Sequence, residues 1–347
     1  MNRHCLPLIA AVSLLPGSQA GGQSPYAGAK TCAACHSEIF RKQQNSHHAR
    51  SLRGVEAVPE VMSRLPFTFQ DKAGGATLHL ERAAAGVDLT AQQGSEIRRL
   101  RLQWSFGSGV KAITMTGLRE DGKYVEGRLT WYRSLGDFDL TTGATRHMPS
   151  NVLESVGREL TGDDLRKCFE CHTTGDAPQV PLQPGAETGI HCERCHGPGR
   201  EHIQTIARPP PSDRKISQPG RLEGFAQAQM CGACHGKPPE DSDLAGIRAI
   251  ETNPNTVRFA SSRLVLSRCF NESDGKLKCT TCHNPHEDAV QAAAQSDRTC
   301  LSCHAKESRR KAAVCAVSRD KCASCHMPRE RVMAHSSFAD HWIRIVR

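Results

Sequence analysis

The stretch CTTCHNPHEDAVQAAAQSDRTCLSCHAKESRRKAAVCAVSRDKCASCH, residues 279–326, contains three copies of one short pattern, Cys-x-x-Cys-His. Four more copies precede it, and every Cys-x-x-Cys in the chain is followed directly by a histidine. This pattern is the attachment site of c-type haem, in which two thiols bond to the porphyrin and the adjacent histidine ligates the iron. The sequence therefore predicts seven covalently bound haems c, at sites that we number 1 to 7 in chain order.

Each predicted site supplies two thiols and one proximal imidazole. The attaching thiols are those of Cys32 and Cys35, Cys168 and Cys171, Cys192 and Cys195, Cys231 and Cys234, Cys279 and Cys282, Cys300 and Cys303, and Cys322 and Cys325. The proximal iron ligands are His36, His172, His196, His235, His283, His304 and His326. Structural zinc also uses paired cysteines, but a zinc site does not require a histidine directly after the second one.

The N-terminus has the form of a secretory signal peptide. Arg3 and His4 precede an apolar run, residues 5–15, and small residues end at Ala20. We therefore expect residues 1–20 to be removed and the mature protein to be periplasmic or otherwise exported, which covalent haem attachment in bacteria also requires. No later segment reaches membrane-spanning length, so we expect no transmembrane anchor after cleavage.

Composition and spacing predict the fold class. Only 38% of residues are hydrophobic and 5% aromatic, so porphyrins are expected to fill much of the core. Alternation of apolar and polar residues over 100–106 predicts a strand inside the 136-residue gap between sites 1 and 2. Thr161, followed by Asp163 and Asp164, predicts the start of a helix that ends at site 2. We expect a mainly α-helical and irregular multihaem cytochrome c with a haem-dominated core and a small β-rich insert. Its expected domains are 21–65, the first haem segment; 66–145, the insert; and 146–347, six haems.

The formal net charge is +9. Each haem carries two propionates, and seven ferric haems with neutral ligands remove about seven positive charges. Arginines are expected to pair with the propionates, because the guanidinium fork matches a carboxylate. The basic balance therefore does not predict a nucleic-acid partner.

Nine histidines remain after the proximal ligands and His4 are set aside, which favours a second imidazole on most of the irons. Ligation is favoured for His202, His286, His335 and His341 and for one of His47 and His48. It is left open for His147 and His191, and His79, in a strand pattern, is expected to be an ordinary polar residue. An iron with two imidazoles has no open position, so it transfers electrons rather than binding substrate.

The stretch GIHCERCHGPGREH, residues 189–202, resembles the bacterial periplasmic multihaem cytochromes c, in the superfamily that includes the tetrahaem electron acceptor of hydroxylamine oxidoreductase. KCFECHTTG at Lys167, SHHARSL at Ser46 and the terminal DHWIRI are similar to its members. The resemblance implies distal ligation by His48, His202, His286 and one of His335 and His341. It also implies a disulfide between Cys269 and Cys315, because a Ser-x-Cys-aromatic run in such chains often accompanies a cysteine before the last motif. Thiolate ligation of a haem is the competing interpretation for these two cysteines.

Two functions remain in competition. The first is a periplasmic electron carrier whose partners are other redox proteins, such as a quinol-oxidising membrane module or a periplasmic oxidoreductase. The second is an enzyme with one five-coordinate haem that acts on small nitrogen or sulfur oxides. The surplus of histidines favours the carrier.

Overall fold

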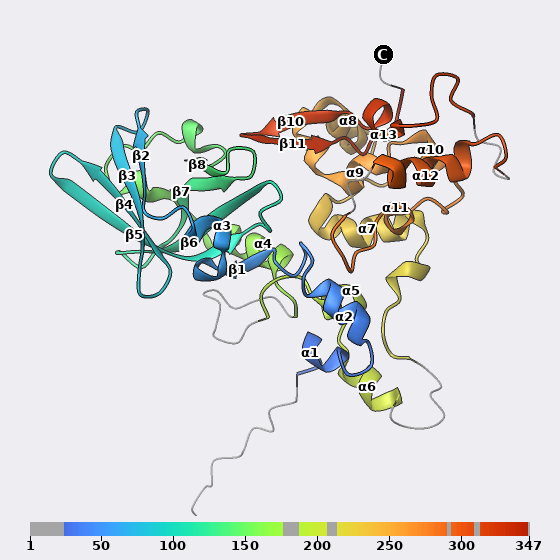
Figure 1. Cartoon of the computed structure of the whole chain (residues 1–347), viewed down its shortest axis with the longest axis horizontal. Helices are drawn as coiled ribbons and strands as arrows, with labels where there is room; N and C mark the ends of the chain where they lie inside the picture. The colour runs from blue at the N-terminus through green and yellow to red at the C-terminus, as the bar shows by residue number, and fades with distance from the viewer. Residues whose placement is uncertain (1–23, 176–186, 207–213, 290–292, 309–312, 346–347) are drawn as a thin grey trace, which may run out of the picture.

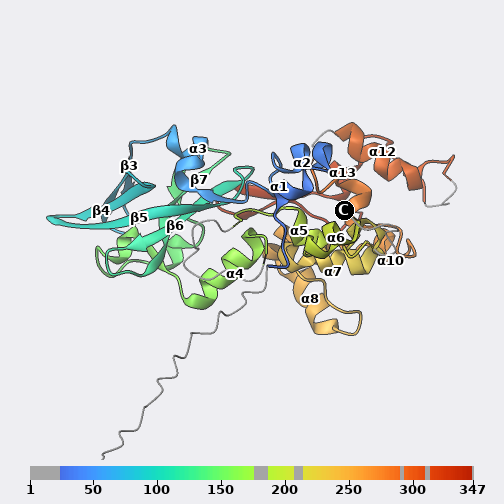
Figure 2. The ribbon, with the colours of Figure 1, turned by 90° about the horizontal axis from the view of Figure 1, so that it is seen from below.

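The structure is a computed structural model of the chain, and it describes residues 24–175, 187–206, 214–289, 293–308 and 313–345. The predicted signal peptide lies outside the described residues. A sheet-rich part and a helix-rich part lie side by side, and Figure 1 shows the sheet on the left and most of the short helices on the right. The turned view in Figure 2 shows the same division.

The sheet-rich part is built on one antiparallel sheet of nine strands. Seven of them follow one another as neighbours in chain order, which short connections between antiparallel strands allow. They are β2 (Phe67–Asp71), β3 (Ala76–Arg82), β4 (Val87–Gln93), β5 (Glu96–Phe106), β6 (Ala112–Arg119), β7 (Tyr124–Tyr132) and β8 (Asp137–Leu140). The other two, β1 (Leu52–Gly54) and β9 (Gly157–Glu159), pair with β5 and β7.

The expectation of a mainly α-helical and irregular fold with only a small β-rich insert is wrong. The sheet curls around a hydrophobic core of its own, in which Leu78, Leu89, Leu100 and Ile113 are fully buried. Strands also form outside the predicted insert, at β1 and β9. The low aromatic content misled the prediction, because this core is made mostly of leucine and valine, and side chains rather than porphyrins fill it.

The helix-rich part consists of short helices and long connections. Its α-helices, with α3 beside the sheet, are α1 (Ala29–Cys32), α2 (Ser37–Gln43), α3 (Pro59–Met62), α4 (Gly162–His172), α5 (Cys192–His196), α6 (Arg200–Ile206), α7 (Gly224–His235), α8 (Leu244–Thr252), α9 (Ala260–Leu264), α10 (Arg268–Asn271), α11 (Cys279–Cys282), α12 (Ala293–His304) and α13 (Cys322–His326). The 3-10 helices are η1 (Val55–Ala57), η2 (Ala144–Arg146), η3 (Glu154–Val156), η4 (Pro219–Arg221) and η5 (Pro254–Arg258).

Every Cys-x-x-Cys-His motif lies in a helix or at its end. Two residues between the cysteines amount to about one helical turn, so both thiols emerge on the same side. The predicted start of α4 is confirmed: the Thr161 hydroxyl accepts the Asp164 N–H, and the Asp164 carboxylate accepts the Thr161 N–H. This capping box fixes the helix that carries site 2.

A second, two-stranded sheet connects the two parts. It is formed by β10 (Arg329–Met333) and β11 (Ser336–Ala339), directly after site 7. Lys111 Nζ, next to β6, donates to the Ser337 carbonyl at 2.7 Å, and the Ser134 hydroxyl donates to the His335 carbonyl at 2.7 Å. These bonds hold the hairpin against the edge of the large sheet.

Candidate haem-binding sites

Four of the seven proximal histidines are oriented by hydrogen bonds to the backbone. The Nδ1 atoms of His172, His196, His304 and His326 lie 2.7 to 2.9 Å from main-chain carbonyl oxygens. A carbonyl oxygen can only accept, so Nδ1 must carry the proton and Nε2 the lone pair. Nε2 is then the atom that can bind iron, and the carbonyl fixes the plane of the ring.

Three proximal imidazoles pair with a second histidine ring, and the distances between the ring centres match those of two imidazoles on one iron. Two nitrogens at about 2.0 Å from a metal, each with its ring centre about 1.1 Å behind it, give ring centres about 6.2 Å apart. The observed ring pairs are His48 with His235 at 6.0 Å and 64°, His196 with His286 at 6.2 Å and 13°, and His283 with His341 at 6.3 Å and 40°. This geometry fits two axial ligands at each of sites 3, 4 and 5.

The three facing histidines have the same tautomer constraint as the proximal ones. His48 Nδ1 lies 3.3 Å from the Pro285 carbonyl, and His341 Nδ1 lies 3.1 Å from the Ala339 carbonyl. His286 Nδ1 lies 3.0 Å from the side-chain oxygen of Asn284. In each case Nε2 is left for the metal.

The imidazole of His235, at site 4, lies close to four other histidine rings. Burial, followed by the neighbouring rings of His48, His341, His283 and His172, lowers the pKa of His235 to about 4. Both causes disfavour the imidazolium, and neutral imidazole is the form that ligates a metal. An open pocket of about 440 Å³ lies among sites 3 and 5, lined by both thiols of site 3 and by His48 and His286.

A half-buried guanidinium beside site 2, with two buried nitrogens, fits a haem propionate. Arg53 Nε and Nη2 and Arg50 Nε are buried without a hydrogen-bond partner. Between them, the Ser51 carbonyl accepts the Nδ1–H of His172. Burial lowers the pKa of Arg53, the nearby Glu60 carboxylate opposes this effect, and the neighbouring Arg50 adds to it. Buried donors without an acceptor are unfavourable, so a carboxylate ligand matches what this position lacks.

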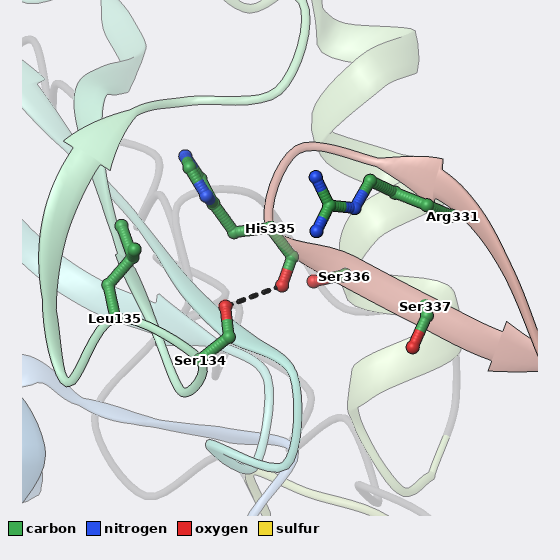
Figure 3. Close-up of a pocket in the computed structure, with 6 residues that line it drawn as sticks. All are labelled: Ser134, Leu135, Arg331, His335, Ser336 and Ser337. Carbon is green, nitrogen blue, oxygen red and sulfur yellow. Dashed lines mark hydrogen bonds between the residues drawn. The ribbon is translucent and has the colours of Figure 1, made fainter.

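Other predicted distal ligands are held elsewhere. His335 Nε2 lies 2.6 Å from an Asp139 carboxylate oxygen, and its ring centre lies 5.0 Å from that of Tyr132. Figure 3 shows His335 beside Ser134 and Leu135 at a pocket of about 260 Å³. The nitrogen that would bind iron is therefore engaged at the edge of the large sheet, in a contact that the sequence did not indicate.

The remaining histidines differ in how their rings are engaged. His202 Nδ1 lies 2.6 Å from the Arg214 carbonyl, which leaves Nε2 for a metal. His47 Nδ1 lies 2.9 Å from an Asp288 carboxylate oxygen. Both ring nitrogens of His191 lie within hydrogen-bonding distance of oxygens of Gln43 and Thr188. His191 is thus a structural contact next to site 3.

The implied disulfide between Cys269 and Cys315 is not formed in the structure, where both are thiols. Cys269 is half-buried near the attaching cysteines of sites 5 and 6, which include Cys282 and Cys300. Cys315 is exposed, and backbone N–H groups of Ser318 and Val317 lower its pKa. The two thiols therefore have separate surroundings.

Buried polar contacts that the sequence did not indicate position two of the sites. Arg263 binds Asp340 through two hydrogen bonds, at 2.9 and 2.6 Å, and this pair lies directly before His341. Glu193, inside motif 3, accepts the backbone N–H groups of Ala27 and Gly28 and so ties the N-terminal segment to α5. No spacing rule marks these residues, because their partners are distant in sequence.

Two family models match segments of this chain, and one solved structure has a similar fold. The family model "Cytochrome c554 and c-prime" matches residues 142–197, and the family model "Doubled CXXCH motif" matches residues 273–309. The crystal structure of the outer cell wall cytochrome OcwA has a similar fold, with a TM-score of 0.53 and 16% identity over 93% of this chain and 80% of that one. No curated protein sequence matches the chain. Within the described residues, no helix combines the length and the apolar character that crossing a bilayer requires. Together the two family-model matches and the seven motifs support a multihaem c-type cytochrome.

Proposed function

We propose that the chain is an exported electron-transfer protein that carries seven covalent haems, one at each Cys-x-x-Cys-His site. The observation that carries this proposal is the set of three histidine pairs with ring centres 6.0 to 6.3 Å apart. A haem bound at each site supplies an iron that can gain and lose one electron. The partial match to the cytochrome c554 family also supports the superfamily that the motifs resemble.

The residues of the chain perform three tasks in this proposal. The paired thiols fix the position of each porphyrin, and the backbone carbonyls orient the proximal rings. With haem bound, His48, His286 and His341 would be the second protein ligands of sites 4, 3 and 5 and would leave those irons no position for substrate, which favours the carrier over the enzyme. We retain His202 as a distal ligand, since its Nε2 is available, and we do not retain His335.

Export and redox partners complete the proposal. The N-terminal pattern and the requirement for haem attachment outside the bacterial cytoplasm support an exported protein, and the similar fold of an outer cell wall cytochrome agrees with both. The proposed partners are other redox proteins, such as a quinol-oxidising module or a periplasmic oxidoreductase. We propose residues 66–145 as the middle of a sheet-rich unit that also takes in β1 and β9 and separates the first haem segment, 21–65, from the six-haem remainder.

Carbon monoxide titration of the fully reduced, purified holoprotein tests this function. Carbon monoxide binds ferrous haem only where an axial position is open. In this proposal two histidines bind the iron at each of sites 3, 4 and 5. At least three of the seven haems should therefore bind no carbon monoxide and keep a low-spin visible spectrum. Binding of seven carbon monoxide molecules per chain would refute the proposed axial ligands.

A further inference from the structure

Helix contacts connect the attachment sites in a pattern that differs from their order along the chain. α1, with Cys32 of site 1, packs against α5, which is site 3. The thiols of Cys32 and Cys192 lie close enough to affect each other's pKa. Site 1 therefore adjoins site 3, although site 2 lies between them in sequence.

Sites 3, 4 and 5 contact one another. His286, three residues after the proximal histidine of site 5, faces the proximal ring of site 3, and the 440 Å³ pocket is lined by both sites. α7, which ends in site 4, packs against α11 of site 5. Cys195 of site 3 lies near Cys231 and Cys234 of site 4.

Sites 6 and 7 extend from site 5. α12, which ends in site 6, packs against both α11 and α13. Asp297 on α12 accepts the backbone N–H groups of Lys321 and Cys322, each at 2.8 Å, and so fixes the start of site 7. This contact places site 7 next to site 6, and the His326 ring also bonds the carbonyl of Arg344, three residues after His341.

Site 2 adjoins site 4, and the His172 carbonyl also accepts the N–H of Gly189, three residues before site 3. Cys171 Sγ lies 3.9 Å from the Ala233 carbonyl, inside motif 4. On its other side, the ring of His172 lies 5.2 Å from that of Phe106 on β5 of the large sheet. Site 2 is therefore located between site 4 and the sheet.

We infer that the seven sites form a branched array rather than a linear row. Sites 3, 4 and 5 make a central group, from which three arms extend: site 1 from site 3, site 2 from site 4, and sites 6 and 7 from site 5. The array thus has three terminal sites, 1, 2 and 7. This inference rests on the proposed function, because it requires a haem at each motif.

The iron positions in the holoprotein, located by anomalous scattering at the iron edge and assigned through the thioether bonds, test the array. The iron of site 2 should have that of site 4 as its nearest neighbour, and the irons of sites 1 and 7 should be nearest to those of sites 3 and 6. A site 2 iron nearest to that of site 1 or site 7 would overturn the inference. Seven irons in another arrangement would leave the proposed function intact, whereas fewer than six irons would contradict the function itself.

Magnetic coupling tests the central group in solution. The double variants H286A/H48A, H48A/H341A and H286A/H341A each open two of sites 3, 4 and 5. Nitric oxide bound to the reduced protein gives each opened site an unpaired electron, while six-coordinate ferrous haems stay diamagnetic. All three variants should show dipolar coupling beyond that of wild-type protein and single variants treated identically. If one double variant showed no added coupling, one of its two opened sites would lie outside the central group.

Discussion

Replacement of His286 by alanine should open one iron and leave the other six unchanged. The His286 ring lies 6.2 Å from that of His196 and is tilted from it by only 13°, so both rings fit the axial positions of site 3. Alanine removes the second ligand but neither thiol, so the haem stays attached. The chain has no other histidine with its ring placed opposite His196 in the described residues.

The size of the effect follows from the number of sites. One of seven irons should change from low-spin to high-spin, which is about one-seventh of the ferric signal, and the reduced variant should bind about one more carbon monoxide per chain than wild type. The angle between the two ring planes gives a second, spectroscopic signature. Nearly parallel imidazoles split the iron orbitals strongly and give a rhombic low-spin electron paramagnetic resonance signal. The rings of His48 and His235, at 64°, give a more anisotropic one.

The assay is therefore electron paramagnetic resonance combined with carbon monoxide titration. H286A should lose a rhombic component, and H48A should lose an anisotropic component instead. H79A is the matched control, because His79 bonds Thr68 in the large sheet at 3.0 Å and should change neither measurement. An H286A protein with an unchanged spectrum and no added carbon monoxide binding would refute the ligand assignment.

Three further outcomes are expected. Arg53→Gln should lower the reduction potential of one haem and make that potential more pH-dependent in the acid range, because a propionate loses its cation. Arg53→Lys, which keeps the positive charge, should lower the potential less. A spectroscopic redox titration measures both changes. Asp340→Asn, which breaks the buried pair with Arg263, should reduce the free energy of unfolding in guanidinium by about 3–5 kcal/mol at pH 7. Burial alone would raise the pKa of Asp340, but hydrogen bonds from Arg263 and its neighbours outweigh it and lower that pKa. The higher free energy of unfolding of the wild type should therefore be present above about pH 4 and disappear as the pH falls below it. The same difference between wild type and variant at all pH values would contradict this. Thiol counting under denaturing, non-reducing conditions should find Cys269 and Cys315 free, and a count of zero would restore the disulfide.

Local chemistry could be predicted from the sequence, because haem attachment needs only five adjacent residues. The same applies to the cap at Thr161 and to the strand alternation within β5. The extent of the sheet could not be predicted, since β1 and β9 are three residues each and pair with strands far away in the chain. Such short strands carry too little periodicity to be recognised alone.

The distal ligands depend on tertiary structure. His48 faces His235 across 187 residues, and only the packing of the N-terminal segment brings the rings together. His335 and His341 are six residues apart and were both expected to ligate, yet one bonds Asp139 and the other faces His283. Sequence spacing cannot separate such cases, because the decisive contacts come from other elements.

The mass of the mature holoprotein, measured after denaturation, tests the central claim most directly. Thioether-bound haem stays with the chain when it unfolds, whereas haem held only by ligation is released. The account predicts the mass of the processed chain plus seven haems, with nothing extracted by acidified acetone. A mass with fewer than six haems would contradict it.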